Sequence, residues 1–229
     1  MNLREHYDSL WNISKKEIIT GSYSIDENLN SSNDRRRGIT LLVRIEKNVL
    51  NNIQTFLDEC KIIEPEQYFY SNLDVHITVL SIITCYDDFE LRSIKVNEYV
   101  GIIRDSIKNI PAFDISFNGI TAAGSSIMLQ GFPSNDNINT IRNNLRRHFK
   151  TSNLQHSIDK RYPIKTAHST IIRFKEKLND PKSFVKLLEK YRDYNFGTAK
   201  VAELELVFND WYQRVENGKV LERFKLLAI

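Results

Sequence analysis

Apolar residues follow two spacings along the chain, one typical of strands and one typical of helices. Short apolar or alternating runs predict β-strands at residues 39–45, 73–83, 112–120, 126–132, 166–174, 204–211 and 220–227. Apolar side chains that recur every three or four residues predict helices at about residues 3–19, 48–60, 96–107, 138–149 and 180–191. Strand, helix and strand alternate in both halves, which predicts an α+β or α/β fold and suggests an internal duplication.

Turn and cap residues agree with these boundaries. Asp180-Pro181 is a favourable N-cap and first-turn pair for the last predicted helix. Asn217-Gly218 and Ala122-Ala123-Gly124 are typical connections between the two strands of a hairpin.

The first 37 residues differ from the rest of the chain. The predicted helix at 3–19 is followed by a stretch rich in Ser, Asn and Asp that continues to Gly38, and this composition predicts a long, mobile loop. We expect residues 1–37 to form an N-terminal helix and loop, and residues 38–229 to form one domain of two lobes.

Composition is that of an ordinary globular protein. The chain has 229 residues, of which 41% are hydrophobic and 27% are charged, so it is too apolar to be disordered. The net charge of +3 gives no argument for nucleic acid binding. Basic residues gather at 35–37 and, more loosely, at 142–175. We expect most of them to solvate the surface, with a local phosphate-attracting field as the alternative.

Signals for targeting, membranes and metals are absent from the sequence. The N-terminus lacks the apolar segment of a signal peptide and no apolar run is long enough to span a membrane, so we expect an intracellular, cytoplasmic protein. Cys60 and Cys85 lack the spacing of metal ligands. His6, His148 and His156 also lack it, so we expect no metal and no other cofactor.

Two short motifs carry the candidate chemistry. His76-Ile77-Thr78 and His168-Ser169-Thr170 each lie within a predicted strand. Because side chains alternate along a strand, each motif presents an imidazole and a hydroxyl on one face, about 7 Å apart. A single histidine on a strand is more often structural than catalytic. Since threonine is about one residue in twenty, chance would give two such motifs among five histidines in only a few per cent of sequences.

The paired motifs resemble the signature of the two-histidine (2H) phosphoesterase superfamily, which includes 2′-5′ RNA ligase-like proteins and cyclic phosphodiesterases. The resemblance covers roughly residues 38–229. It implies two pseudo-symmetric, β-rich lobes that face a central groove, with one motif contributed by each lobe. It also implies a phosphodiesterase that acts on a nucleotide or short RNA at a 2′,3′-cyclic or 2′-5′ linkage.

The residue types in the motifs suit phosphodiester cleavage without a metal. One group must take a proton from the attacking oxygen while another protonates the leaving oxygen, and histidines suit both roles because their pKa lies near neutrality. The hydroxyls of Thr78 and Thr170 can donate hydrogen bonds to the non-bridging phosphate oxygens. We therefore expect His76, Thr78, His168 and Thr170 to be catalytic. Either histidine can be the acid, and both hydrolysis and ligation stay open.

Five further residues are candidates for substrate binding: Tyr70, Tyr162, Arg173, Arg37 and Trp211. The three aromatic residues could stack on a base, although each is more often a packing residue. Arg37 could bind phosphate from the basic cluster before the first strand. On a regular strand Arg173 points away from the second motif, so a β-bulge would be needed to bring it to a phosphate.

Two other classes of protein fit parts of the pattern. A non-catalytic protein could bind a nucleotide or cyclic oligonucleotide in the same groove, but binding requires cationic and stacking residues rather than two proton-transfer groups. A structural or partner-binding protein would bury both motifs. The expected partner is a nucleotide or short RNA, and the sequence implies neither a membrane nor an obligate protein partner.

Overall fold

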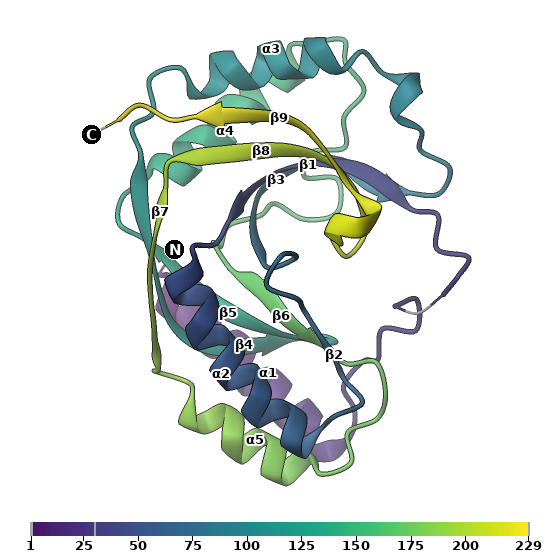
Figure 1. The fold of residues 1–229 in the computed structure, drawn as a ribbon, viewed down its shortest axis with the longest axis vertical. Helices are drawn as coiled ribbons and strands as arrows, with labels where there is room; N and C mark the ends of the chain where they lie inside the picture. Colours follow the sequence, from purple (N-terminus) through teal and green to yellow (C-terminus); the bar gives the residue numbers. More distant parts are fainter. Residues whose placement is uncertain (1, 30, 229) are drawn as a thin grey trace.

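The protein folds into two antiparallel β-sheets in a computed structural model that describes residues 2–29 and 31–228 (Figure 1). Sheet A contains β1 (Arg37–Arg44), β3 (His76–Tyr86), β8 (Glu203–Asp210) and β9 (Lys219–Lys225), in the spatial order β3-β1-β8-β9. Sheet B contains β2 (Tyr68–Phe69), β4 (Phe113–Ala123), β5 (Ser126–Pro133), β6 (Ser169–Arg173) and β7 (Asn195–Val201), in the order β2-β6-β5-β4-β7. This architecture confirms the predicted α+β class with two lobes.

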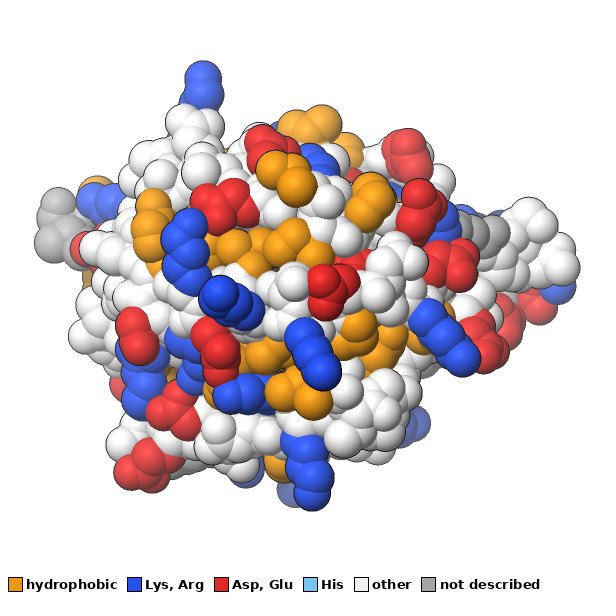
Figure 2. Space-filling model, turned by 90° about the horizontal axis from the view of Figure 1, so that it is seen from below, with side chains coloured by type: hydrophobic (Ala, Val, Ile, Leu, Met, Phe, Trp, Pro, Cys, Tyr) orange, Lys and Arg blue, Asp and Glu red, His pale blue; other side chains and the backbone are white. Residues whose placement is uncertain are grey.

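Helices pack on both sheets. Helices α1 (Leu3–Thr20) and α2 (Lys47–Ile63) contact sheet B, and α5 (Pro181–Lys190) packs against both of them. Helices α3 (Val96–Ile107) and α4 (Asn137–Lys150) contact each other and sheet A. Two short 3-10 helices lie at Leu91–Ser93 and Val215–Asn217. Seen from the side of α5, acidic and basic side chains are interspersed with small apolar groups, so this face has no field of a single sign (Figure 2).

The two sheets repeat one strand-helix-strand connection. The chain runs through β1, α2 and β3 in sheet A and through β5, α4 and β6 in sheet B, and in both cases the two strands are antiparallel neighbours. In both cases the connecting helix packs on the opposite sheet, because α2 contacts β6 and β7 whereas α4 contacts β3. The repeat agrees with the predicted duplication and places β3 and β6 each beside the strand that begins its own strand-helix-strand unit.

Four strands differ from the prediction, and one of them, the two-residue β2, was not predicted at all. β3 begins at His76 rather than residue 73, because a turn in which the N–H groups of Asp74 and Val75 donate to the carbonyl of Ser71 precedes it. β6 begins at Ser169 rather than residue 166, so both motifs lie at the start of a strand instead of in its middle. β7 was also not predicted, because its sequence is rich in Asn, Gly, Thr and Lys, most of which are weak strand formers.

The segment between α1 and β1 crosses from sheet B to sheet A. α1 ends at Gly21, whose φ of 73° closes the helix in the left-handed conformation. Further along, the Asp26 N–H donates to the carbonyl of Phe174, and Leu29 is only 2% exposed. The division of the chain at residue 37 stays a prediction. Within the described part of the chain, no helix combines the length and the apolar character needed to cross a bilayer.

Candidate active site

His76 lies at the start of β3, and one of its ring nitrogens is fixed by the backbone. Its Nδ1 atom is 2.6 Å from the carbonyl oxygen of Asp74, and the side chain is 9% exposed. Because a carbonyl can only accept, Nδ1 carries the hydrogen of the neutral ring and donates it. The Nε2 lone pair is thereby left for another partner.

His168 has an equivalent setting at the start of β6. Its Nδ1 atom is 2.6 Å from Oγ1 of Thr166, which also lies two residues before the histidine. His168 and the threonines of the two motifs, Thr78 and Thr170, are half-buried. Each lobe therefore contributes an imidazole whose Nδ1 is engaged, together with a partly accessible threonine two residues further along the chain.

A β-bulge follows each motif and changes which side chains share its face. In β3 the pairing with β1 skips Val79, and both Val79 and Leu80 are buried. In β6 the pairing with β5 skips Ile171, and both Ile171 and Ile172 are buried. Arg173 consequently returns to the face of the second motif. The β-bulge that the sequence analysis required for Arg173 to reach the motif is present in β6.

The two motif strands approach each other where sheet A meets sheet B. Cα atoms of β3 and β6 come within 8 Å of each other, although the two strands are not paired as neighbours in a sheet. The pKa values of His76 and His168 are both lowered to about 4, chiefly by burial and in smaller part by the positive charge of Arg173. Arg44 contributes for His76 and Arg142 for His168. Both imidazoles are therefore neutral at pH 7.

Arg173 is held by three side chains from distant parts of the chain. Its Nε donates to the hydroxyl of Tyr70 at 2.9 Å, and its NH1 donates to Oδ2 of Asp26 at 3.1 Å. The guanidinium lies 5.3 Å from the ring centroid of Tyr212, whose hydroxyl donates to Oδ1 of Asp26 at 2.8 Å. Tyr70 is only 2% exposed, so in this structure it orients Arg173 rather than offering a free stacking surface.

The other predicted binding residues lie in different surroundings. Trp211 contacts the guanidinium groups of both Arg36 and Arg161, each 4.5 Å from its ring centroid. Arg37 donates to two backbone carbonyls of the segment that precedes β1. Tyr162 is 66% exposed in the connection between α4 and β6. The structure therefore brings Arg173 and Tyr70 to the motifs. The contacts of Arg37 and Trp211 given above are with residues outside the two motifs.

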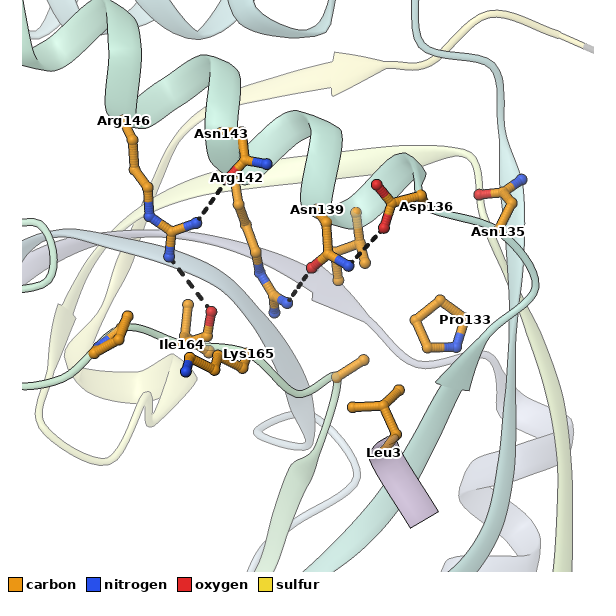
Figure 3. A pocket seen from close by; sticks show the side chains of 13 residues that line it. Leu3, Pro133, Asn135, Asp136, Asn139, Arg142, Asn143, Arg146, Ile164 and Lys165 are labelled. Atoms are coloured by element: carbon orange, nitrogen blue, oxygen red, sulfur yellow. Dashed lines mark hydrogen bonds between the residues drawn. The ribbon is translucent and has the colours of Figure 1, made fainter. Parts of the chain in front are cut away.

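A cleft of about 550 Å³ opens beside the second motif rather than over it (Figure 3). Its walls are α4 and the segment 163–167, with Leu3 and Pro133 opposite the helix. Ala167 lines it but neither His76 nor His168 does. Arg142 extends from α4 toward the segment that leads into β6, whereas the sequence had placed this residue in the solvated basic cluster.

In the described part of the chain, the His, Cys, Asp and Glu side chains do not gather into a metal site. Across residues 2–29 and 31–228, no three or more His, Cys, Asp or Glu side chains converge in a way that could hold a metal. The polar groups nearest the motif imidazoles are hydroxyls, backbone carbonyls and guanidinium groups, of which the hydroxyls and guanidinium groups suit a phosphate anion.

Comparison with known proteins gives one family and one fold. A family model described as the AKAP7 2′5′ RNA ligase-like domain matches residues 39–217. No curated protein matches the chain. Escherichia coli LigT, solved in complex with 3′-AMP, is similar with a TM-score of 0.56 and 12% identity, over 84% of this chain and 99% of that one.

Two further solved structures have the same fold. One is described only as a phosphoesterase and gives a TM-score of 0.57 at 14% identity, over 84% of this chain and 99% of the other. The second is the protein TT0787 of Thermus thermophilus, with a TM-score of 0.59 at 12% identity, over 83% of this chain and 98% of the other. At such low identity these likenesses establish the fold.

Proposed function

The chain belongs to the family of AKAP7 2′5′ RNA ligase-like domains, within the 2H phosphoesterase superfamily, and from this premise we propose that it is a phosphodiesterase. Its substrate is a nucleotide or short RNA with a 2′,3′-cyclic or 2′-5′ linkage. The observation that supports the proposal best is the equivalent setting of His76 and His168, each with Nδ1 engaged and Nε2 left for a substrate.

The reaction needs two proton transfers on opposite sides of phosphorus. With a 2′,3′-cyclic phosphate, one imidazole takes a proton from water as the water oxygen bonds to phosphorus. The other imidazole, protonated beforehand, gives its proton to the 2′ or 3′ oxygen as its bond to phosphorus breaks. The two rings have then exchanged protonation states, and proton exchange with solvent restores them.

Hydroxyl and guanidinium groups supply the stabilisation of the phosphate. Thr78 and Thr170 share a face with the imidazoles and can donate to the non-bridging oxygens, on which negative charge grows in the transition state. The bonds of Arg173 to Tyr70 and Asp26 leave further N–H groups on its guanidinium for a phosphate oxygen. We assign phosphate binding to Arg173, with Tyr70 and Asp26 as the groups that orient it.

Replacing either motif threonine should weaken catalysis less than replacing a histidine. Thr78→Val and Thr170→Val keep the shape of the side chain and remove one donor to a charged oxygen, so we expect kcat to fall about tenfold. Thr198→Val is the matched control, because Thr198 is an exposed residue of β7 whose hydroxyl contacts that of Ser116 on β4. Steady-state kinetics of the three variants measure the effect. Equal losses of kcat in all three variants would contradict the role of Thr78 and Thr170 in stabilising the phosphate.

Nucleotides are the substrates to test first. LigT has been solved with 3′-AMP, ATP and NADP⁺, which supports, for a chain of the same fold, a site that accepts nucleotides. The panel consists of 2′,3′-cyclic mononucleotides, 2′-5′ and 3′-5′ dinucleotides and cyclic oligonucleotides. Turnover of the 2′,3′-cyclic or 2′-5′ members supports the proposed function. Tight binding of one member without turnover would instead indicate a non-catalytic nucleotide-binding protein.

A further inference from the structure

Arg142 is a buried cation that contacts the backbone of β3 and of the segment that leads into β6. It lies on α4 and is only 1% exposed. Its Nε donates to the carbonyl of Val79 at 2.9 Å, and its NH2 donates to the carbonyls of Thr78 at 3.2 Å and Thr166 at 2.7 Å. One side chain therefore joins the first motif to the residue that contacts the imidazole of the second.

The charge of Arg142 is balanced by carbonyl dipoles. Its remaining contact is from NH1 to Oδ1 of Asn139 at 3.4 Å, and none of the ion pairs in the described residues includes it. Burial lowers its pKa to about 10, so it still carries its charge at neutral pH. A buried charge without a carboxylate destabilises a fold unless its donors are satisfied, and here the donors are directed at the carbonyls of Thr78, Val79 and Thr166.

The position of Arg142 explains how two strands from different sheets keep a fixed separation. β3 is the edge strand of sheet A, and β6 belongs to sheet B, so no ladder of backbone hydrogen bonds joins them. The carbonyls of Thr78 and Val79 lie at the bulge of β3, and Arg142 binds them there. On the other side it binds the carbonyl of Thr166, whose hydroxyl contacts Nδ1 of His168.

We propose that Arg142 is a positioning residue that fixes the distance and orientation of His168 relative to the motif on β3. This inference rests on the proposed function, because the separation of two proton-transfer groups matters only if both act on one phosphate. Arg142 is not expected to touch substrate, since its donors are already directed at backbone carbonyls. Its role is to hold Thr166, and through Thr166 the imidazole of His168.

Two substitutions separate the geometric role from the charge. Arg142→Lys keeps the buried positive charge but cannot bind β3 and Thr166 at once, because lysine lacks the planar fork of donors. Arg142→Met removes the charge as well. Arg146→Met is the matched control, one turn along α4, where the replaced side chain pairs with Asp159.

We expect Arg142→Lys to lower kcat about tenfold to a hundredfold with KM nearly unchanged, because a small displacement of an acid-base group has that effect. Arg146→Met should retain the wild-type kcat. Thermal unfolding shows whether each variant is folded, and if Arg142→Met does not fold, Arg142→Lys still provides the kinetic test. A folded Arg142→Lys variant with wild-type kcat would overturn the proposal.

A second readout tests positioning without relying on turnover. The charged or titratable groups that influence His168 are Arg142 on α4, Arg173 on β6 and His6 on α1, and His168 in turn influences His76 on β3. Nuclear magnetic resonance titration of the His168 imidazole should show a higher pKa in Arg142→Met, in which a nearby positive charge is lost. In Arg142→Lys the imidazole resonances should shift although the charge remains.

The two readouts also separate this inference from the proposed function. If the wild type hydrolyses no member of the panel, the proposed function fails. The positioning role is then tested by the resonances alone, and unchanged His168 resonances in Arg142→Lys would overturn it. If the wild type is active and the folded Arg142→Lys variant is equally active, the positioning role fails and the proposed function stands.

Discussion

Replacing either His76 or His168 by alanine should lower phosphodiester turnover at least about a hundredfold, since general acid-base catalysis contributes on that order. Each substitution removes one of the two proton-transfer groups that the proposed mechanism requires. The expected effect on folding is small, because the imidazoles are held by single hydrogen bonds, to Asp74 and to Thr166, each worth about 1 kcal/mol. Single-turnover rates and thermal unfolding measure the two effects.

His148→Ala is the control for these two variants. This histidine lies on α4 and its Nδ1 contacts the hydroxyl of Ser106 on α3, away from both motifs. We expect it to retain full turnover. Comparable unfolding of His76→Ala, His168→Ala and the threonine variants would mean that the motifs are structural, and wild-type turnover in either histidine variant would contradict a two-histidine mechanism.

The pH dependence of kcat/KM should have an acidic optimum. The free protein holds both imidazoles at a pKa of about 4, well below the ordinary value near 6.5, whereas the mechanism needs one ring protonated and the other neutral. Above the pKa of the imidazoles, the fraction of protein molecules with one imidazole protonated falls tenfold for each pH unit. We therefore expect kcat/KM to fall about tenfold per unit above roughly pH 5.

The pH dependence of kcat should differ in a defined direction. A bound phosphodiester places a negative charge beside the imidazole that acts as the acid, which favours its protonated form and raises its pKa. The falling limb of kcat should consequently lie at higher pH than that of kcat/KM. Rates measured across the pH range at saturating and at low substrate test this. If kcat and kcat/KM instead fell over the same pH range, near the ordinary histidine pKa, the low pKa of the imidazoles in the free protein would be contradicted.

The motifs and most secondary structure could be predicted from the sequence because they depend on local spacing. Alternating and three-to-four-residue periods predicted the helices and seven of the strands, and the repeated strand-helix-strand order indicated the duplication. The orientation of Arg173 could not be predicted in this way. A bulge adds one residue to a strand and reverses the side-chain alternation beyond it, and nothing in the residues around Ile171 marks that extra position.

Arg142 could have been recognised from the sequence with a stricter use of helical spacing. It lies four residues after Ile138 and three before Leu145, so it occupies the apolar stripe of α4. A charged residue in such a stripe is a candidate for a buried polar contact. The carbonyls that it binds belong to residues 63, 64 and 24 positions away, and these partners depend on the tertiary fold.

The contacts of Asp26 show the same limit. This carboxylate lies in a polar segment whose composition predicts a loop, yet it accepts hydrogen bonds from Arg173 and Tyr212, 147 and 186 residues away. Loop composition predicts the absence of regular structure, and it carries no information about which distant side chains a loop residue will contact. The segment before the family match is therefore joined to the candidate site through Asp26.

The most direct test of the two-histidine mechanism compares the wild type with the His76→Ala/His168→Ala double variant in the presence of EDTA, on whichever member of the nucleotide panel is cleaved fastest. We expect turnover to survive chelation in the wild type and to vanish in the folded double variant. Turnover that EDTA abolishes, or that the double variant retains, would contradict the account.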